Sequence, residues 1–224
     1  YLKGMFAFAI WDEKKKKLFL ARDHIGIKPL YFSQIEKDFI FSSEIRTICQ
    51  IKRKIYNKDI LPNSRLFNEY LVFGNIYGEK TLINEIYSVE PGHYIVVENN
   101  KILKKKYWSP LSNIDKNLKN KTEDYLTERL QDLLKNVFAE WSISDVETGM
   151  FLSSGLDSNL VNSIMHKDSD IEKFILNFSG TKKSENEYEI LKKSLSFNSN
   201  KMNVINSSEE AIHGNLSQLI AHTY

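Results

Sequence analysis

The stretch Phe151-Leu152-Ser153-Ser154-Gly155-Leu156-Asp157-Ser158-Asn159 decides the fold of the second half of this chain. It follows a short run of apolar residues, 150–152, and precedes apolar residues at helical spacing in 160–165. A strand that passes through a loop of small residues into a helix is typical of an anion-binding turn in an α/β domain. The stretch therefore predicts a buried strand, a loop and a helix N-terminus that faces a ligand.

The side chains of this loop suit a bound pyrophosphate. The first N–H groups of a helix are unpaired, and the positive end of its dipole attracts anions. Ser153, Ser154 and Ser158 add hydroxyl groups, and Gly155 permits close approach of the backbone. Asp157 would repel a bare phosphate, so we predict a Mg²⁺ ion between its carboxylate and the pyrophosphate. The alternative is an ordinary strand-to-helix turn in which Asp157 only complements the helix dipole.

Strands and helices alternate beyond residue 121. The pattern predicts a helix from Thr122, strands at 147–152, 173–178 and 202–205, and helices at 158–167, 185–195 and 208–222. Ser207-Ser208-Glu209-Glu210 has the form of a capping box for the last helix. Alternation of this kind predicts a parallel sheet whose ligands lie at the carboxyl ends of the strands, where the 153–158 loop is placed.

The first half of the chain has the pattern of antiparallel hairpins. Strands are predicted at 5–11, 18–21, 30–33, 39–42, 86–89, 94–97 and 102–107, and helices at 44–50 and 65–73, the second with Ser64 as its N-cap. Residues 109–121 have the composition of a linker. We therefore expect one domain at 1–108 and a second at 122–224.

Composition narrows the class of protein. The net charge is +2, from 31 basic and 29 acidic residues, which gives no argument for nucleic-acid binding. There is no apolar run near the roughly 20 residues of a membrane span and no signal peptide, so we expect a cytoplasmic protein without membrane partners. The single cysteine, Cys49, excludes an internal disulfide and is predicted to be a buried structural thiol. The abrupt apolar start and helical end lead us to expect an internal fragment.

Several motifs resemble one family. The 153–158 loop resembles the Ser-Gly-Gly-Leu-Asp-Ser loop of the ATP pyrophosphatases, in particular that of glutamine-hydrolysing asparagine synthetases, with Ser154 in place of the first Gly. If that position has a positive φ, Ser154 is strained by roughly 1 kcal/mol or more. The first half resembles the glutaminase domain of the same family at Gly4-Met5-Phe6-Ala7-Phe8-Ala9-Ile10-Trp11-Asp12, at 21–31 and at 41–45, and the passage to its synthetase domain at Pro91-Gly92-His93-Tyr94 and Tyr107-Trp108.

The resemblance implies a fold and a reaction. It implies part of an antiparallel, N-terminal-nucleophile-type glutaminase sandwich at 1–108, and part of a parallel-sheet α/β nucleotide-binding domain at 122–224. Ammonia from glutamine would attack an aspartyl adenylate made from aspartate and ATP, with Mg²⁺, to give asparagine, AMP and pyrophosphate. The substrates would be glutamine, aspartate and ATP, and a homodimer is compatible with this expectation.

The family's site residues carry over in part. Ser153, Ser154, Gly155, Leu156, Asp157 and Ser158 match the pyrophosphate loop, with Asp157 as metal ligand, Leu152 expected near the adenosine and Leu176 near adenine. No catalytic residue is assigned, because the N-terminal cysteine precedes the matching stretch. Arg22-Asp23-His24 corresponds to loop and domain-interface structure, where Arg22 and Glu44 could line an ammonia route.

Two other functions stay open. An amidotransferase of the same fold could act on another carboxylate, such as a sugar acid of a surface polysaccharide or a specialised metabolite. A non-catalytic homologue could bind a nucleotide or a partner protein, which the departure at Ser154 suggests. A tRNA-modifying enzyme is disfavoured, because the charge is near neutral and no basic, aromatic-interleaved patch is present.

Overall fold

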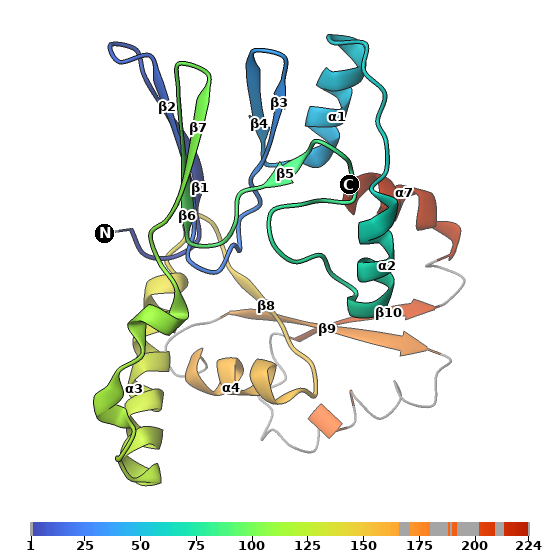
Figure 1. Ribbon diagram of the computed structural model, residues 1–224. Helices are drawn as coiled ribbons and strands as arrows, with labels where there is room; N and C mark the ends of the chain where they lie inside the picture. Colours follow the sequence, from blue (N-terminus) through green and yellow to red (C-terminus); the bar gives the residue numbers. More distant parts are fainter. Residues whose placement is uncertain are drawn as a thin grey trace. The chain divides into compact units, whose positions relative to one another are not determined.

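A computed structural model describes residues 2–165, 171–179, 188, 190–191, 202–208 and 213–223. The chain divides into two compact units between Asp115 and Lys116, inside the segment 109–121 that the sequence suggests is a linker. The exact domain bounds stay a prediction, and each unit is described by itself (Figure 1).

The first unit contains two antiparallel sheets and two helices. One sheet has the order β1-β2-β6-β7, formed by Ala7–Asp12, Lys17–Arg22, His93–Glu98 and Lys101–Lys106. The other has the order β4-β3-β5, formed by Asp38–Ser42, Tyr31–Ile35 and Tyr87–Ser88. Helix α1 spans Ile45–Lys54 and α2 spans Ser64–Phe73. The predicted antiparallel pattern is confirmed, with strand ends shifted by one or two residues.

Tight turns set the register of these hairpins. Asn99 and Asn100 join β6 to β7, and both have positive φ values, 50° and 58°, as the turns that suit twisted strands require. The turn between β1 and β2 is held by Asp12, whose carboxylate accepts the N–H groups of Lys14 and Lys15 at 3.1 and 3.0 Å.

Both sheets of the first unit contribute to one apolar core. Its buried residues are Leu20, Leu30, Phe32, Val89 and Ile95. Gly92 begins the return into β6 with φ +66°, and a Cβ atom there would lie 2.6 Å from the Trp108 carbonyl oxygen. That close approach lets the Gly92 carbonyl accept the N–H groups of Tyr107 and Trp108, at 2.8 and 3.2 Å.

The second unit is built on a parallel sheet of order β10-β9-β8. Its strands are Met202–Ser208, Glu172–Ser179 and Gly149–Phe151, and the short 3₁₀ turns Pro110–Asn113 and Lys116–Leu118 precede it in the chain. Its helices are α3 at Glu123–Trp141, α4 at Leu156–Met165 and α7 at Leu216–Thr223. Leu152, Ile175 and Leu191 form its buried core. The predicted combination of antiparallel sheets with a parallel sheet is therefore confirmed.

Helix starts were predicted with mixed success. Helix α3 begins near Thr122, as expected, and Thr122 is its N-cap, with its hydroxyl accepting the Tyr125 N–H at 3.4 Å. The predicted N-cap Ser64 is wrong. Asn63 caps α2 instead, because its Oδ1 reaches the Leu66 N–H at 3.4 Å while Ser64 is already helical.

The predicted capping box at 207–210 is also wrong. Ser207 and Ser208 belong to β10, where they pair in parallel with Phe178 and Ser179 of β9. Pairing with a neighbouring strand overrides the local preference of serine for a helix cap. Glu209, Glu210 and most of the predicted helix 185–195 lie outside the described residues.

Two burial predictions need correction. The strand before the loop is not buried throughout: Leu152 is 3% exposed but Phe151 is 82% exposed, since neighbouring side chains of a strand point to opposite faces. Cys49 is half-buried in α1 rather than buried. Among the described residues, no helix is long and apolar enough to cross a membrane.

Candidate functional site

The predicted anion loop lies where the parallel sheet places it. Strand β8 ends at Phe151, helix α4 begins at Leu156, and residues 152–155 connect them at the carboxyl end of the strand. The Leu152 N–H donates to the Phe174 carbonyl oxygen at 2.9 Å, so β9 holds the start of the loop. A loop at this end of a parallel sheet is a common ligand position in α/β proteins.

Side chains of the loop organise its own backbone. The Ser158 Oγ lies 2.9 Å from the Ser153 carbonyl oxygen and 3.2 Å from that of Gly155. It also accepts the Ser153 N–H at 3.2 Å and lies 2.9 Å from the Ser153 Oγ. The Gly155 N–H donates to the Ser153 Oγ at 3.3 Å. The hydroxyl and N–H groups of this loop therefore bond to other groups of the same loop.

Asn159 is part of this arrangement, although the sequence pattern indicates no role for it. Its Nδ2 donates to the carbonyl oxygens of Ser153 and Gly155, at 3.1 and 2.8 Å. Both neighbours are acceptors, which fixes the orientation of the amide group. The only sequence signal is its place next to Ser158, and spacing alone could not show where its side chain turns.

Ser154 is not strained. The described residues with positive φ other than glycine are Lys16, Glu36, Asn57, Glu85, Asn99 and Asn100, and Ser154 is not among them. The substitution of serine for the usual glycine therefore has no backbone cost in this loop. Gly155 also avoids positive φ, but a Cβ atom there would lie only 3.2 Å from the Ser153 Oγ. Its lack of a side chain keeps the Ser153 hydroxyl in place.

Asp157 lies in the first turn of α4, where a carboxylate complements the helix dipole. It is exposed, and no ion pair to it is found among the described residues. The described part of the chain holds no cluster of three or more metal-binding side chains. An exposed carboxylate with no ion pair among the described residues fits Mg²⁺, which is commonly held by one or two carboxylates together with substrate phosphates.

An apolar depression of about 330 Å³ adjoins the loop. Leu152, Ser153 and Leu176 line it together with Phe151, Phe174, Ile175 and Leu191. Leu176 is 46% exposed, so it is a surface residue of this depression rather than a core residue. The Phe174 carbonyl points toward β8. Peptide groups two residues apart in a strand point to the same side, so those of Leu176 point to the side of β8, beyond the end of that strand.

Arg22 and Asp23 are engaged in structure rather than chemistry. The Asp23 carboxylate is buried and accepts N–H groups of Phe6, Ile27 and Lys28, at 3.3, 2.9 and 2.9 Å. Burial acts to raise the pKa of Asp23, but these N–H groups outweigh it and hold the pKa below its ordinary value. Burial lowers the pKa of the Arg22 guanidinium, whose bonds are all to groups of the first unit.

The other candidate groups of the first unit also lack a reactive arrangement. The His24 ring packs edge-on against Trp108 and Tyr107, with ring centroids 5.0 and 5.6 Å apart. Burial raises the pKa of the Cys49 thiol, which disfavours the reactive thiolate. Glu44 is the N-cap residue of α1 and makes no capping bond with its side chain.

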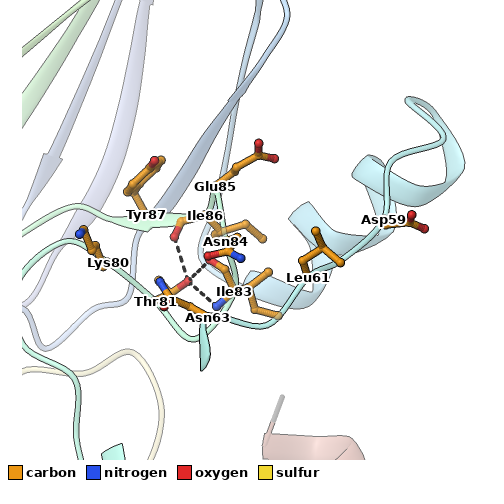
Figure 2. A pocket seen from close by; sticks show the side chains of 10 residues that line it. All are labelled: Asp59, Leu61, Asn63, Lys80, Thr81, Ile83, Asn84, Glu85, Ile86 and Tyr87. Carbon is orange, nitrogen blue, oxygen red and sulfur yellow. Dashed lines mark hydrogen bonds between the residues drawn. The ribbon is translucent and has the colours of Figure 1, made fainter. Parts of the chain in front are cut away.

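A second depression, of about 450 Å³, lies in the first unit (Figure 2). Its polar side chains mostly serve the fold. The Thr81 Oγ1 lies 2.8 and 3.0 Å from the carbonyl oxygens of Ile86 and Ile83, Asn63 caps α2, and the Asn84 Nδ2 donates to the Pro62 carbonyl oxygen at 3.3 Å. We assign this depression no reaction.

Comparison with known proteins matches two successive parts of the chain to two protein families. Residues 1–108 match a family described as a glutamine amidotransferase domain, and residues 129–223 match one described as asparagine synthase. The chain is 32% identical over 178 residues to asparagine synthetase (glutamine-hydrolyzing) 2 of Bacillus subtilis, covering 76% of this chain and 24% of that protein.

Two further relatives cover similar parts of the chain. A Methanocaldococcus jannaschii protein named putative asparagine synthetase (glutamine-hydrolyzing) 2 is 32% identical over 79% of this chain and 34% of its own length. Amidase chry2 of Gibberella zeae is 29% identical over 72% of this chain and 23% of its own length. The chain thus spans between about a quarter and a third of these relatives.

Proposed function

We propose, because this chain belongs to the family of glutamine-hydrolysing asparagine synthetases, that the intact protein amidates aspartate with ammonia taken from glutamine. The reaction would consume ATP, pass through an aspartyl adenylate and release AMP and pyrophosphate. The enzyme is a carbon–nitrogen ligase with glutamine as amide donor.

One observation carries this proposal most directly: the anion loop and the apolar depression adjoin each other through Leu152 and Ser153. An ATP molecule needs both, since its phosphates are anionic and its base is flat and largely apolar. We place the pyrophosphate at Ser153, Ser154, Gly155 and Ser158, where Leu156 begins the helix, and the adenine against Leu152 and Leu176. The Leu176 N–H and C=O point to the side of β8, beyond the end of that strand, and such a pair would complement the N1 and N6 edge of adenine.

The chain's own groups can assist adenylation in a simple way. A carboxylate is a poor electrophile until one of its oxygens belongs to a good leaving group, here AMP. The N–H groups at the start of α4 and the loop hydroxyls would stabilise the negative charge that collects on the departing pyrophosphate. Asp157 would hold Mg²⁺, which when bound supplies charge neutralisation of the phosphates.

The remaining parts of the proposal concern the whole protein. We place the first unit in a glutaminase domain of the N-terminal-nucleophile sandwich type, supported by its two antiparallel sheets and by the glutamine amidotransferase match. Its catalytic cysteine would lie outside residues 1–224. A cytoplasmic location suits an enzyme that draws on ATP, glutamine and aspartate, and a homodimer is the assembly we would test first.

A second candidate function differs only in the carboxylate that accepts the amide nitrogen. The match to a relative named as an amidase favours testing another carboxylate, such as a sugar acid or a specialised metabolite, in place of aspartate. The loop and depression would serve either acceptor, since both reactions begin with ATP.

Pyrophosphate release by the intact protein tests the proposal. With ATP, Mg²⁺ and ammonia, release should depend on aspartate and be matched by asparagine. Asp157→Asn should abolish this release and leave glutamine hydrolysis largely intact, whereas the control Asp145→Asn, an exposed carboxylate of the same unit, should retain both. Release that depends on another carboxylate would favour the second candidate. If no acceptor gives ATP-dependent release of pyrophosphate, the proposed ligase activity is refuted.

A further inference from the structure

The Ser158 hydroxyl has more acceptors around it than it has protons. A serine hydroxyl donates one hydrogen bond, yet three oxygen atoms lie within reach of the Ser158 Oγ: the Ser153 and Gly155 carbonyl oxygens and the Ser153 Oγ. If this proton turned to a phosphate oxygen, neither carbonyl oxygen would receive it.

Asn159 supplies the donors that this change requires. Its Nδ2 carries two protons and lies 3.1 Å from the Ser153 carbonyl oxygen and 2.8 Å from that of Gly155, the same two acceptors that Ser158 contacts. The Asn159 N–H adds a third bond, to the Gly155 carbonyl oxygen at 3.2 Å. The two carbonyl groups therefore keep a partner whichever way the Ser158 proton points.

The direction of these carbonyl groups matters to an anion. A carbonyl oxygen that turned toward a bound phosphate would repel it, while the N–H groups of the same peptides attract it. Bonds from Asn159 hold both carbonyl oxygens on the side of its own amide, at the first turn of α4. The loop can then meet a phosphate without a reorganisation of its backbone, which would otherwise reduce affinity.

We propose that Asn159 is a positioning residue: it holds the carbonyl groups of Ser153 and Gly155 while the Ser158 hydroxyl donates to a phosphate oxygen of ATP. This inference rests on the proposed function, since it needs ATP at the loop. Asn159 itself contacts no phosphate and acts through the backbone and Ser158.

A double-mutant cycle tests this role in the intact protein. The dissociation constant of ATP is measured with Mg²⁺ for the wild type, Asn159→Ala, Ser158→Ala and the double variant. Asn159→Ala should weaken ATP binding about tenfold, as expected for the loss of one or two hydrogen bonds. In the Ser158→Ala background the same change should weaken binding about threefold or less, because no hydroxyl proton remains to be released.

Controls separate this role from simple support of the helix. Alanine is a better helix former than asparagine, so Asn159→Ala should keep its fold, which the thermal unfolding midpoint checks. Ser163→Ala, which removes a hydroxyl bonded to the Leu160 carbonyl oxygen at 2.8 Å later in α4, should leave ATP affinity unchanged.

The outcomes distinguish this inference from the function on which it rests. Equal weakening by Asn159→Ala in both backgrounds would overturn the coupling to Ser158 and leave a structural role. If the wild type binds ATP and the Asn159→Ala variant binds it equally well, this inference alone is overturned. Wild-type protein that binds neither ATP nor inorganic pyrophosphate would overturn the proposed function, and this inference with it.

Discussion

The Arg22 Nη1 donates to the Val89 carbonyl oxygen at 2.7 Å, across 67 positions of the sequence. The same guanidinium donates to the Ser88 Oγ at 2.9 Å and to the carbonyl oxygens of Gly26 and Lys28, at 2.7 and 2.8 Å. One side chain therefore joins the end of β2 to the loop that follows it and to the end of β5.

Arg22→Lys should destabilise the first unit by about 2 kcal/mol, although it keeps the charge. A lysine ammonium cannot reproduce the planar fork that reaches four acceptors, so at least one of these acceptors loses its donor. Trp11 and Trp108 lie in this unit and Trp141 in the other, so urea unfolding in a Trp141→Phe background reports on the first unit. Arg65→Lys, an exposed arginine of α2, is the control and should cost little; equal loss in both would contradict this role.

Asp23 should make the first unit sensitive to acid. Its pKa is lowered in the folded state, so the stabilisation is fully present above the unfolded value of about 3.9 and is lost as the pH falls through the folded value. The free energy of unfolding should therefore fall below about pH 4 more steeply in the wild type than in Asp23→Asn. At neutral pH Asp23→Asn should itself be destabilised, because its amide NH₂ would face backbone N–H donors. Parallel pH profiles of the two proteins would count against this prediction.

The sequence predicts a structural feature of this chain well where neighbouring residues alone determine that feature. Hairpins and the start of α3 near Thr122 depend on neighbouring residues, and the sequence predicts them. The sequence does not predict the cap at Asn63, because the direction of the Asn63 side chain decides it. It does not predict the extended Ser207 and Ser208 either, because pairing with the neighbouring strand β9 decides their conformation. The sequence pattern predicts the loop between β8 and α4, but the hydrogen bonds of Asn159 depend on where one amide turns.

The buried Lys52 should tolerate loss of its charge better than loss of its partner. Lys52 is 1% exposed, and its Nζ lies 2.7 Å from the Glu85 Oε2, whose side chain is 73% exposed. Glu85→Gln leaves a buried ammonium beside a neutral group and should cost about 1–3 kcal/mol. Lys52→Met removes the buried charge, keeps much of the volume and leaves Glu85 to water, so its effect should stay within about 1 kcal/mol. Urea unfolding compares the two, and the reverse order would show that the ion pair itself stabilises the fold.

Asn162 should be a stability defect of the second unit. It is 5% exposed in α4, and its Oδ1 has no hydrogen-bond partner among the described residues. A buried unsatisfied polar group costs about 1–3 kcal/mol, and alanine has the higher helix propensity, so Asn162→Ala should raise the unfolding free energy. Trp141 fluorescence in a Trp11→Phe, Trp108→Phe background reports on this unit. Destabilisation would mean that the Oδ1 binds a group of the intact protein or a buried water.

Restoring glycine at position 154 should not improve ATP binding. Because Ser154 does not have positive φ, Ser154→Gly relieves no strain and adds freedom to the unfolded chain, at a cost of up to about 1 kcal/mol. The dissociation constant of ATP should stay within about threefold of the wild type. Gly155→Ala is the matched comparison: its Cβ would lie 3.2 Å from the Ser153 Oγ and should disturb the hydroxyl that accepts the Gly155 N–H. Its ATP affinity should fall well below that of Ser154→Gly, whereas tighter binding by Ser154→Gly would mean that the ATP-bound loop needs a left-handed residue there.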